Sequence, residues 1–440
     1  MSWEGLKNIL LFSLIVISGL LTWSYWFYQP TYEIDSSRYV QTKIMSNGNV
    51  DPDEVVQPTK LIYHDRGSYY GTYSEEKVTE MMANIKKINL FNFQDRSEKY
   101  EDEGSIRGLI EKDGTFEIVF NDMVPLSFYK KYLKIEDSNV PEVNFDRIIV
   151  FTENSDETNP SIYFISEGKN TVVAASVENE DLEQFGETFA NKADYVRYKK
   201  IAITDERSVI VPANEQRVPG YRYLTKYVTA TSFMKALFSS PEIVKQEGDI
   251  YTDGLSIMKV NSKTSTLEYK NLAVGAKEEK NPDTHILERS IDYINIHSGW
   301  DKRYRYAAMN EADKEIIYRL HINGLPVFND FGISEYDVEW GTENVRVYER
   351  PYVFLGDKAL TQTEVILSKA EDALASFKKS MSEQYNPDKL EDMTIGYEMT
   401  VDDSTGADIV ALKPTWYFFY DQDWVKIADK TEGGIIDGLE

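Results

Sequence analysis

Residues 367–381 read LSKAEDALASFKKSM, and two further apolar stretches follow, MTIGYEMTV at 393–401 and IVALKPTWYFFY at 409–420. In the first stretch, apolar residues recur at intervals of three and four, which places them on one face of a helix. The other two stretches are rich in β-branched and aromatic residues, as strands are. We therefore expect a helix that covers one face of an antiparallel sheet. The apolar residues of this helix are Leu367, Ala370, Leu374, Phe377 and Met381.

The same order of one helix and two strands recurs upstream. Helical patterns at 181–190, 231–239 and 285–296 are each followed by two strand patterns. The spacing of these α-β-β units is irregular, so they are not the repeats of a solenoid. The fold class that we predict is α+β, built of antiparallel sheets covered by helices. The expected strands are 195–203 and 208–211, 250–260 and 267–274, and 303–308 and 316–322.

An earlier copy of the pattern begins at residue 75. Residues 75–90 carry apolar side chains at helical spacing, and 106–111 has the pattern of a strand. Asp113-Gly114 precedes the alternation of Phe116, Ile118 and Phe120, which indicates a hairpin. Three more strands are expected at 147–151, 162–165 and 171–177.

The N-terminal region contains a long uncharged run. Residues 9–27 read ILLFSLIVISGLLTWSYWF, and these 19 residues as a helix would extend about 28 Å, close to the ~30 Å of a bilayer core. A cleaved signal peptide would have a shorter apolar region, ~7–15 residues, and a small-x-small cleavage site. Here the run ends in aromatic residues of the kind found at membrane interfaces. We predict an uncleaved transmembrane helix at the cell membrane, with a cytoplasmic N-terminus and the bulk of the chain extracytoplasmic.

The predicted domain boundaries follow from breaks in these patterns. Residues 29–58 are polar and have the composition of a stalk, residues 200–220 contain two prolines, and the charged stretch 275–283 reads GAKEEKNPD. The expected order is a stub at 1–8, a transmembrane helix at 9–28, a stalk at 29–58, and α+β domains at 59–200, 201–280 and 281–440.

Composition excludes several classes of function. The chain has 48 Lys and Arg against 74 Asp and Glu, a net charge of −26, so phosphate-rich nucleic acid and anionic lipid headgroups would be repelled. Without any cysteine, it cannot form a disulfide scaffold, a thiolate metal site or a cysteine nucleophile.

The motifs of common enzymes and cofactor sites are also missing. His64, His285, His297 and His321 have no metal-ligand spacing, and no phosphate-binding glycine loop occurs. Ser-x-x-K occurs at Ser166, Ser232 and Ser376, but without the K-T-G that would complete a serine acyltransferase site. We expect no catalytic residue, no metal and no cofactor. A hydrolase with an unrecognised pair of carboxylates stays open as an alternative.

Six short stretches, taken in order, resemble the YycH (WalH) family. They are YQPTYE at 28–33, YTDG at 251–254, LEYKN at 267–271, GWDKRYR at 299–305, NGLPVF at 323–328 and LKPTW at 412–416. One departure is Asn271-Leu272, where the family leads us to expect Asn-Pro. The resemblance runs from the uncharged N-terminal segment to near the C-terminus.

The resemblance implies a non-enzymatic, membrane-anchored regulator of a bacterial two-component system. The implied partners are a WalK (YycG)-like sensor histidine kinase and a YycI-like anchored protein, and the implied process is cell-wall metabolism. The resemblance does not say whether the kinase is activated or inhibited. The alternatives are a cell-wall-active hydrolase and a ligand-binding scaffold unrelated to a kinase.

Two sets of residues are candidates for partner contact. Small residues four apart in a membrane helix allow a second helix to approach closely. This points to Ser18, Gly19 and Thr22, flanked by Leu14 and Leu21, although small residues are common in any membrane helix. In the extracytoplasmic part, large aromatic residues can anchor an interface or pack a core. The candidates there are Trp300, Phe328 and Trp416.

Overall fold

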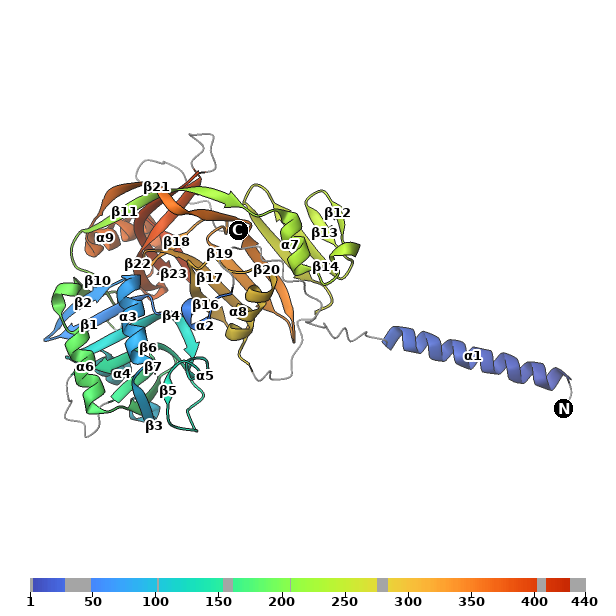
Figure 1. Cartoon of the computed structure of the whole chain (residues 1–440), viewed down its shortest axis with the longest axis horizontal. Coiled ribbons are helices and arrows are strands. Elements are labelled where there is room, and N and C mark those ends of the chain that lie inside the picture. Colours follow the sequence, from blue (N-terminus) through green and yellow to red (C-terminus); the bar gives the residue numbers. More distant parts are fainter. Residues whose placement is uncertain are drawn as a thin grey trace. The chain divides into compact units, whose positions relative to one another are not determined.

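The computed structural model describes residues 3–27, 49–100, 103–152, 161–205, 207–274, 284–401 and 409–427. The chain divides into two units, residues 1–40 with helix α1 (Trp3–Phe27) and residues 41–440 with all the other elements (Figure 1). The helix expected at 9–27 is therefore present. Among the described residues, however, no helix meets the joint requirement of length and hydropathy for crossing a membrane.

The first half of the second unit forms a ten-stranded sheet with the strand order β10-β9-β2-β1-β4-β6-β7-β8-β3-β5. Its strand pairs are antiparallel except for β3 with β5. Its strands are β1 (Lys60–Asp65), β2 (Ser68–Thr72), β3 (Asn89–Asp95), β4 (Thr115–Pro125), β5 (Lys134–Ile135), β6 (Asn144–Phe151), β7 (Ser161–Ser166), β8 (Thr171–Ser176), β9 (Val196–Ala202) and β10 (Ser208–Pro212).

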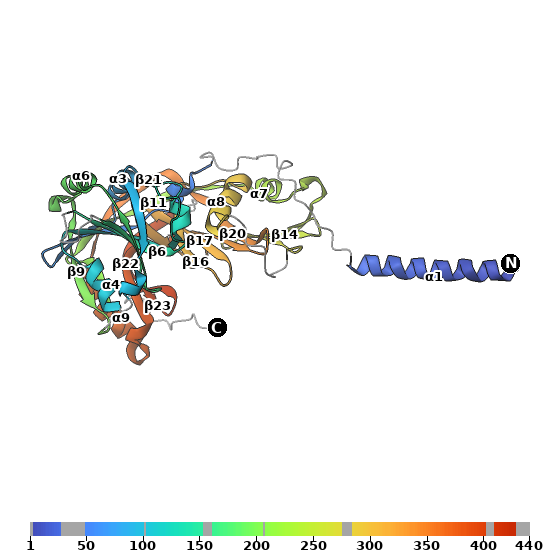
Figure 2. The same cartoon turned by 90° about the horizontal axis from the view of Figure 1, so that it is seen from below.

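Helices cover both faces of this sheet. In Figure 2, α3 (Glu75–Ile85) and α6 (Asn179–Phe189) lie on one side of the strands and α4 (Glu103–Ile110) on the other. Consecutive residues of β8 are therefore buried, Val173 in the cluster that includes α6 and Val172 in the cluster that includes α4. The short helical turns here are α2 (Pro52–Val55), α5 (Leu126–Tyr129), η2 (Ser97–Tyr100) and η3 (Lys192–Asp194).

Three local predictions for this half differ from the structure. Residues 106–111 were expected as a strand, but they belong mostly to α4, because Ile106, Leu109 and Ile110 have helical spacing and pack together on the sheet. Asp113-Gly114 does not connect two strands. Gly114, with a φ of +76°, links α4 to β4, and its N–H donates to the His64 carbonyl at 2.8 Å. The expected helix at 75–90 ends at Ile85, and its last residues open β3.

The second half forms a fourteen-stranded sheet with the order β12-β13-β14-β15-β20-β19-β17-β18-β22-β23-β11-β21, to which β16 and β24 add at β17 and β23. Only β18 and β22 pair in parallel among these described strands. They are β11 (Gln216–Tyr227), β12 (Lys245–Glu247), β13 (Ile250–Thr252), β14 (Ser256–Asn261), β15 (Thr266–Asn271), β16 (Tyr304–Asn310), β17 (Glu315–Ile322), β18 (Leu325–Phe328), β19 (Glu335–Trp340), β20 (Val345–Pro351), β21 (Val353–Leu367), β22 (Leu390–Val401), β23 (Ile409–Tyr420) and β24 (Asp423–Lys426).

The α-β-β units expected here are present. Helix α7 (Ala230–Leu237) precedes β12 to β15, α8 (Ile286–His297) precedes β16 and β17, and α9 (Ala370–Met381) precedes β22 and β23. Phe377, on the face of α9 that the periodicity predicted, stacks on Phe418 of β23 with the ring centroids 4.2 Å apart. Leu367, which was expected at the start of the same helix face, is instead the last residue of β21, because the chain is still extended and paired with β11 there. The single strand expected at 250–260 is two, β13 and β14. The remaining helical turns are η4 (Pro241–Ile243), η5 (Ser382–Gln384) and η6 (Pro387–Lys389).

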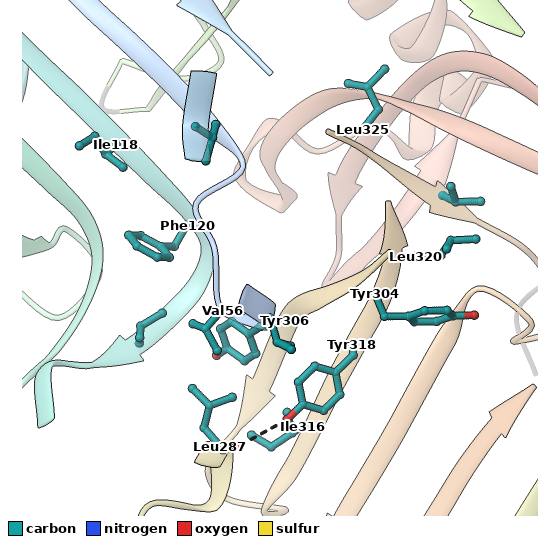
Figure 3. Packing of buried hydrophobic residues seen from close by; sticks show 14 of the residues in the cluster. Val56, Ile118, Phe120, Leu287, Tyr304, Tyr306, Ile316, Tyr318, Leu320 and Leu325 are labelled. Carbon is teal, nitrogen blue, oxygen red and sulfur yellow. Dashed lines mark hydrogen bonds between the residues drawn. The ribbon is translucent and has the colours of Figure 1, made fainter. Parts of the chain in front are cut away.

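The two sheets share one hydrophobic core (Figure 3). Along the seam between β4 and β16, Tyr306 donates from its hydroxyl to the Met123 carbonyl at 2.7 Å, and its own carbonyl accepts from the Asn121 amide at 3.0 Å. Val56, from the segment expected to be a stalk, is fully buried in this core, while residues 29–48 of that segment lie outside the described residues. The predicted boundaries at 200/201 and 280/281 stay predictions.

Candidate partner-binding sites

Helix α1 carries the first set of candidate residues. Ser18, Gly19 and Thr22 are exposed and fall on one face, and the Thr22 hydroxyl donates to the Ser18 carbonyl at 2.8 Å. A Cβ atom at Gly19 would meet nothing within 4 Å, so this face leaves room for a second helix. Leu14 is also exposed, and the side chain of Leu21 lies outside what the structure describes. The other large exposed apolar residues described on this helix are Trp3, Leu11, Phe12, Ile15, Val16, Ile17 and Leu20.

The second set of candidates is buried. Trp300 has no exposed surface and meets Tyr318 edge to face, with the ring centroids 4.9 Å apart. Phe328 stacks on Tyr417 at 3.9 Å. The indole N–H of Trp416 donates to the Ser368 carbonyl at 3.0 Å. A partner could reach these rings only if the folded body, the unit of residues 41–440, opened. Their burial therefore supports the alternative interpretation, core packing.

A cavity of about 250 Å³ lies between two parts of the fourteen-stranded sheet. Residues of β11, β21, β22 and β23 form one wall, and Tyr304, Leu320 and Ile333 stand on the other. Leu320, Leu355 and Val410 are apolar residues of this lining, and they are buried. The sequence alone does not indicate this cavity, because its lining comes from strands that are far apart in the chain. The one signal was GWDKRYR at 299–305, which supplies Asp301 and Tyr304 to the lining.

The charged end of the cavity is an internal ion pair. Arg303 donates through Nε to Asp301 Oδ1 at 2.8 Å and through a terminal nitrogen to Oδ2 at 2.5 Å. The same guanidinium donates to the carbonyls of Leu355 and Gly356 on β21 at 2.8 and 3.2 Å. Burial acts to lower the pKa of Arg303, but Asp301 outweighs this effect and raises it. Asp301 is thus neutralised before any ligand arrives.

A buried arginine supports the wall that carries Tyr304. Arg350 is 2% exposed and donates to Ser298 Oγ at 2.6 Å, the Tyr348 hydroxyl at 3.0 Å and the Tyr336 hydroxyl at 2.9 Å. Tyr336 stacks on Tyr304 with a centroid distance of 3.9 Å. The guanidinium therefore fixes the ring against which Tyr304 packs, which makes this wall of the cavity rigid.

The histidines contact neighbouring groups within the fold or are buried in it. His64 Nε2 lies 3.1 Å from Glu117 Oε2 in the ten-stranded sheet, and His285 Nδ1 accepts from the Leu287 N–H at the start of α8. Burial lowers the pKa of His297 to about 4 and that of His321 to about 3. In the described part of the chain, no group of three or more His, Asp or Glu residues is placed to hold a metal ion.

Two of the three Ser-x-x-K motifs also have local structural contacts. Ser166 Oγ accepts from the Lys169 N–H at 3.2 Å in the turn after β7. Ser232 lies in the first turn of α7, where its N–H donates to Thr229 Oγ1 at 3.3 Å and its own Oγ lies 2.9 Å from the same atom. Neither arrangement favours a nucleophilic serine.

Comparisons with known proteins cover both halves of the chain. Residues 4–193 match the family model described as "YycH protein, N-terminal domain", and residues 206–433 match "YycH protein, C-terminal domain". The chain is 22% identical, over 94% of each sequence, to the Bacillus subtilis protein named "Two-component system WalR/WalK regulatory protein YycH". The crystal structure of YycH from Bacillus subtilis superposes with a TM-score of 0.73 at 20% identity, covering 86% of this chain and 98% of that one. The α+β fold is thus a known one.

Proposed function

This chain belongs to the YycH family, and from that membership we propose that it regulates a two-component system of the WalR/WalK kind. The observation that carries the proposal is the match to both family domains, 4–193 and 206–433, together with similarity to a regulatory protein of that system over 94% of the chain. A similarity limited to one domain would support the fold alone.

The finer proposal concerns the partners. We propose that the chain binds a WalK-like sensor histidine kinase together with a YycI-like anchored protein, without catalysing a reaction, and thereby affects cell-wall metabolism. The exposed apolar surface of α1 supports a contact at the level of the membrane, because a surface of this kind is covered in a working protein by lipid or by another chain. The aromatic residues of the body are largely committed to its core.

The proposed membrane anchor rests on the uncharged run at residues 9–27, and the family model for the N-terminal domain begins at residue 4, within α1. We expect the full-length chain to stay in the membrane pellet after washing with alkaline carbonate. A chain that lacks residues 1–28 should appear in the supernatant. Release of the full-length chain by carbonate would exclude a membrane-spanning anchor.

The regulation that we propose is a shift between kinase states. A helix that packs better against one state of the kinase raises the population of that state by its difference in affinity. A preference of ~1.4 kcal/mol changes the ratio of the two states tenfold. Such a mechanism needs a close helix contact, and Ser18, Gly19 and Thr22, with Leu14 and Leu21 beside them, are the residues that we propose for it.

We expect Gly19→Ile to lower the amount of sensor kinase that co-purifies with the full-length chain by tenfold or more. The added side chain would separate the two helices at their closest approach. The measurement is affinity purification from native membranes with quantitative mass spectrometry. The matched control is Ile17→Phe, which adds bulk about 200° around the same helix, at ~100° per residue.

The two variants and the wild type separate the possible results. Equal losses for both variants would point to a general loss of membrane insertion, against the proposed face. Unchanged recovery with Gly19→Ile would remove Gly19 from the contact and leave the family-based function intact. No kinase with the wild-type chain would overturn the proposed partner itself.

A further inference from the structure

We propose that the cavity lined by β11, β17, β21, β22 and β23 is a docking pocket for a large, uncharged side chain of a partner protein. This inference rests on the proposed function, since a regulator of this kind works by contacting another protein. It adds the place on the body at which the contact is made, and the kind of side chain that the partner must insert there.

The cavity opens to solvent at a rim, where two of its lining residues are exposed. Tyr227 and Val401 both line it, and they are 50% and 54% exposed. The lining residues Leu320 and Leu355 are buried. A side chain that enters from the rim would therefore leave water and contact apolar groups that are already fixed in place.

Charge identifies the kind of group that fits. The whole chain carries −26, yet Asp301 is the only residue with a formal charge at neutral pH among those described as lining the cavity, and Arg303 already binds its carboxylate. Tyr227, Tyr304, Phe354 and Met399 contribute aromatic and thioether surface. Depletion of charge with enrichment of aromatic residues and methionine is the composition of an interface core. A charged group would lose its hydration here without gaining a partner.

The size of the cavity suits one large side chain. Pockets for drug-sized ligands have volumes of ~300–1,000 Å³ and enclose most of the ligand. At about 250 Å³ and with two half-exposed lining residues, this cavity is smaller and more open. It has the form of the central pocket of a protein interface, into which one anchoring side chain is inserted.

The test places a charge at the rim of the pocket. Val401→Asp would put a carboxylate where the partner's apolar side chain enters. The matched control is Ile366→Asp on β21, because Ile366 is also a β-branched strand residue, is 57% exposed, and pairs with Arg217 at the other end of β11. Tyr227→Ser is a second rim variant. All are made in the full-length chain, and their thermal unfolding is compared with the wild type.

We expect the rim variants to lower the recovery of the sensor kinase or of the second anchored protein at least fivefold, with no change for Ile366→Asp. A photo-crosslinking residue at position 401 should attach to that same protein, through a peptide with a large apolar residue, and one at position 366 should not. Wild-type recovery with both rim variants would overturn the pocket and leave the proposed function standing. A wild-type chain that recovers neither protein would overturn both. A lipid that co-purifies with the wild type but not with Val401→Asp would assign the cavity to lipid instead.

Discussion

Replacing Gly324 with alanine is expected to destabilise the folded body by about 2–5 kcal/mol. Gly324 has a φ of +79° in the two-residue turn between β17 and β18, and an L-residue in this conformation costs ~1–2 kcal/mol. The new Cβ would also lie 1.8 Å from the Tyr73 carbonyl oxygen, so backbone must move, at a further cost of ~1–3 kcal/mol. Tyr73 follows β2, so the displaced contact is one that holds the two sheets together.

A nearly identical turn provides the control. Gly67, with a φ of +69°, lies in the two-residue turn between β1 and β2, but a Cβ there would meet nothing within 4 Å. We expect Gly67→Ala to cost only the conformational part, about 1–2 kcal/mol. The measurement is the denaturant midpoint of each variant under identical conditions. Equal midpoints for the two variants would show that the turn at Gly324 does not press against Tyr73.

Elements with a long apolar periodicity could be predicted from the sequence. The helices at 181–190, 231–239, 285–296 and 367–381 all exist within a few residues of those limits, because each must bury one face on a sheet. The eight-residue α4 was mistaken for a strand, since two turns are too few to separate helical spacing from a short apolar run. The turn at Asp253-Gly254 between β13 and β14 was not predicted either, because β13 is too short for its pattern to be separated from that of β14.

Contacts between distant segments could not be predicted in this way. Nothing near Gly324 in the sequence indicates that Tyr73 lies against it. The cavity has the same origin, because Tyr227, Val353, Val401 and Val410 meet only after the strand order is fixed. Trp300 and Trp416 were candidates for an interface because they are large aromatic residues. The sequence alone does not show whether such a residue lies at an interface or packs in the core, as both do here.

Which carboxylates lie opposite each other is known only once the strand register is known. In a chain with 74 Asp and Glu, their presence alone decides nothing. The register places Glu268 opposite Glu349 and Glu349 opposite Asp337, across β15, β20 and β19. Like charges directly opposite each other destabilise a sheet. Burial first, and then the neighbouring Glu315, raise the pKa of Asp337 to about 8, so Asp337 and Glu315 together hold one proton at neutral pH.

We therefore expect the body to lose stability as the pH rises from 6.5 to 8.5. The folded chain holds a proton on Asp337 that the unfolded chain, with an ordinary pKa of 3.8, has already released, so unfolding becomes easier until the pH passes the folded pKa. For a folded pKa of about 8, the loss over this window is up to about 2 kcal/mol. At pH 6.5 an ordinary histidine is still half protonated, so His285, His297 and His321, whose pKa values burial lowers, add an opposite effect of up to about 0.4 kcal/mol each at the lower end of the window, and the wild type and an Asp337 variant share this effect.

The Asp337→Asn variant tests this assignment, because it keeps the shape of the side chain and removes the proton. The measurement is the free energy of unfolding at several pH values from 6.5 to 8.5, for the wild type and the variant. We expect the variant to lose no stability over this window and to be more stable than the wild type at pH 8.5, where the wild type carries one more charge among Glu268, Glu315 and Glu349. Glu364→Gln, which removes an exposed carboxylate paired with Arg217 on the same sheet, should keep the wild-type slope. A wild-type slope in Asp337→Asn would mean that another group takes up the proton, because linkage allows no slope without a difference in bound protons.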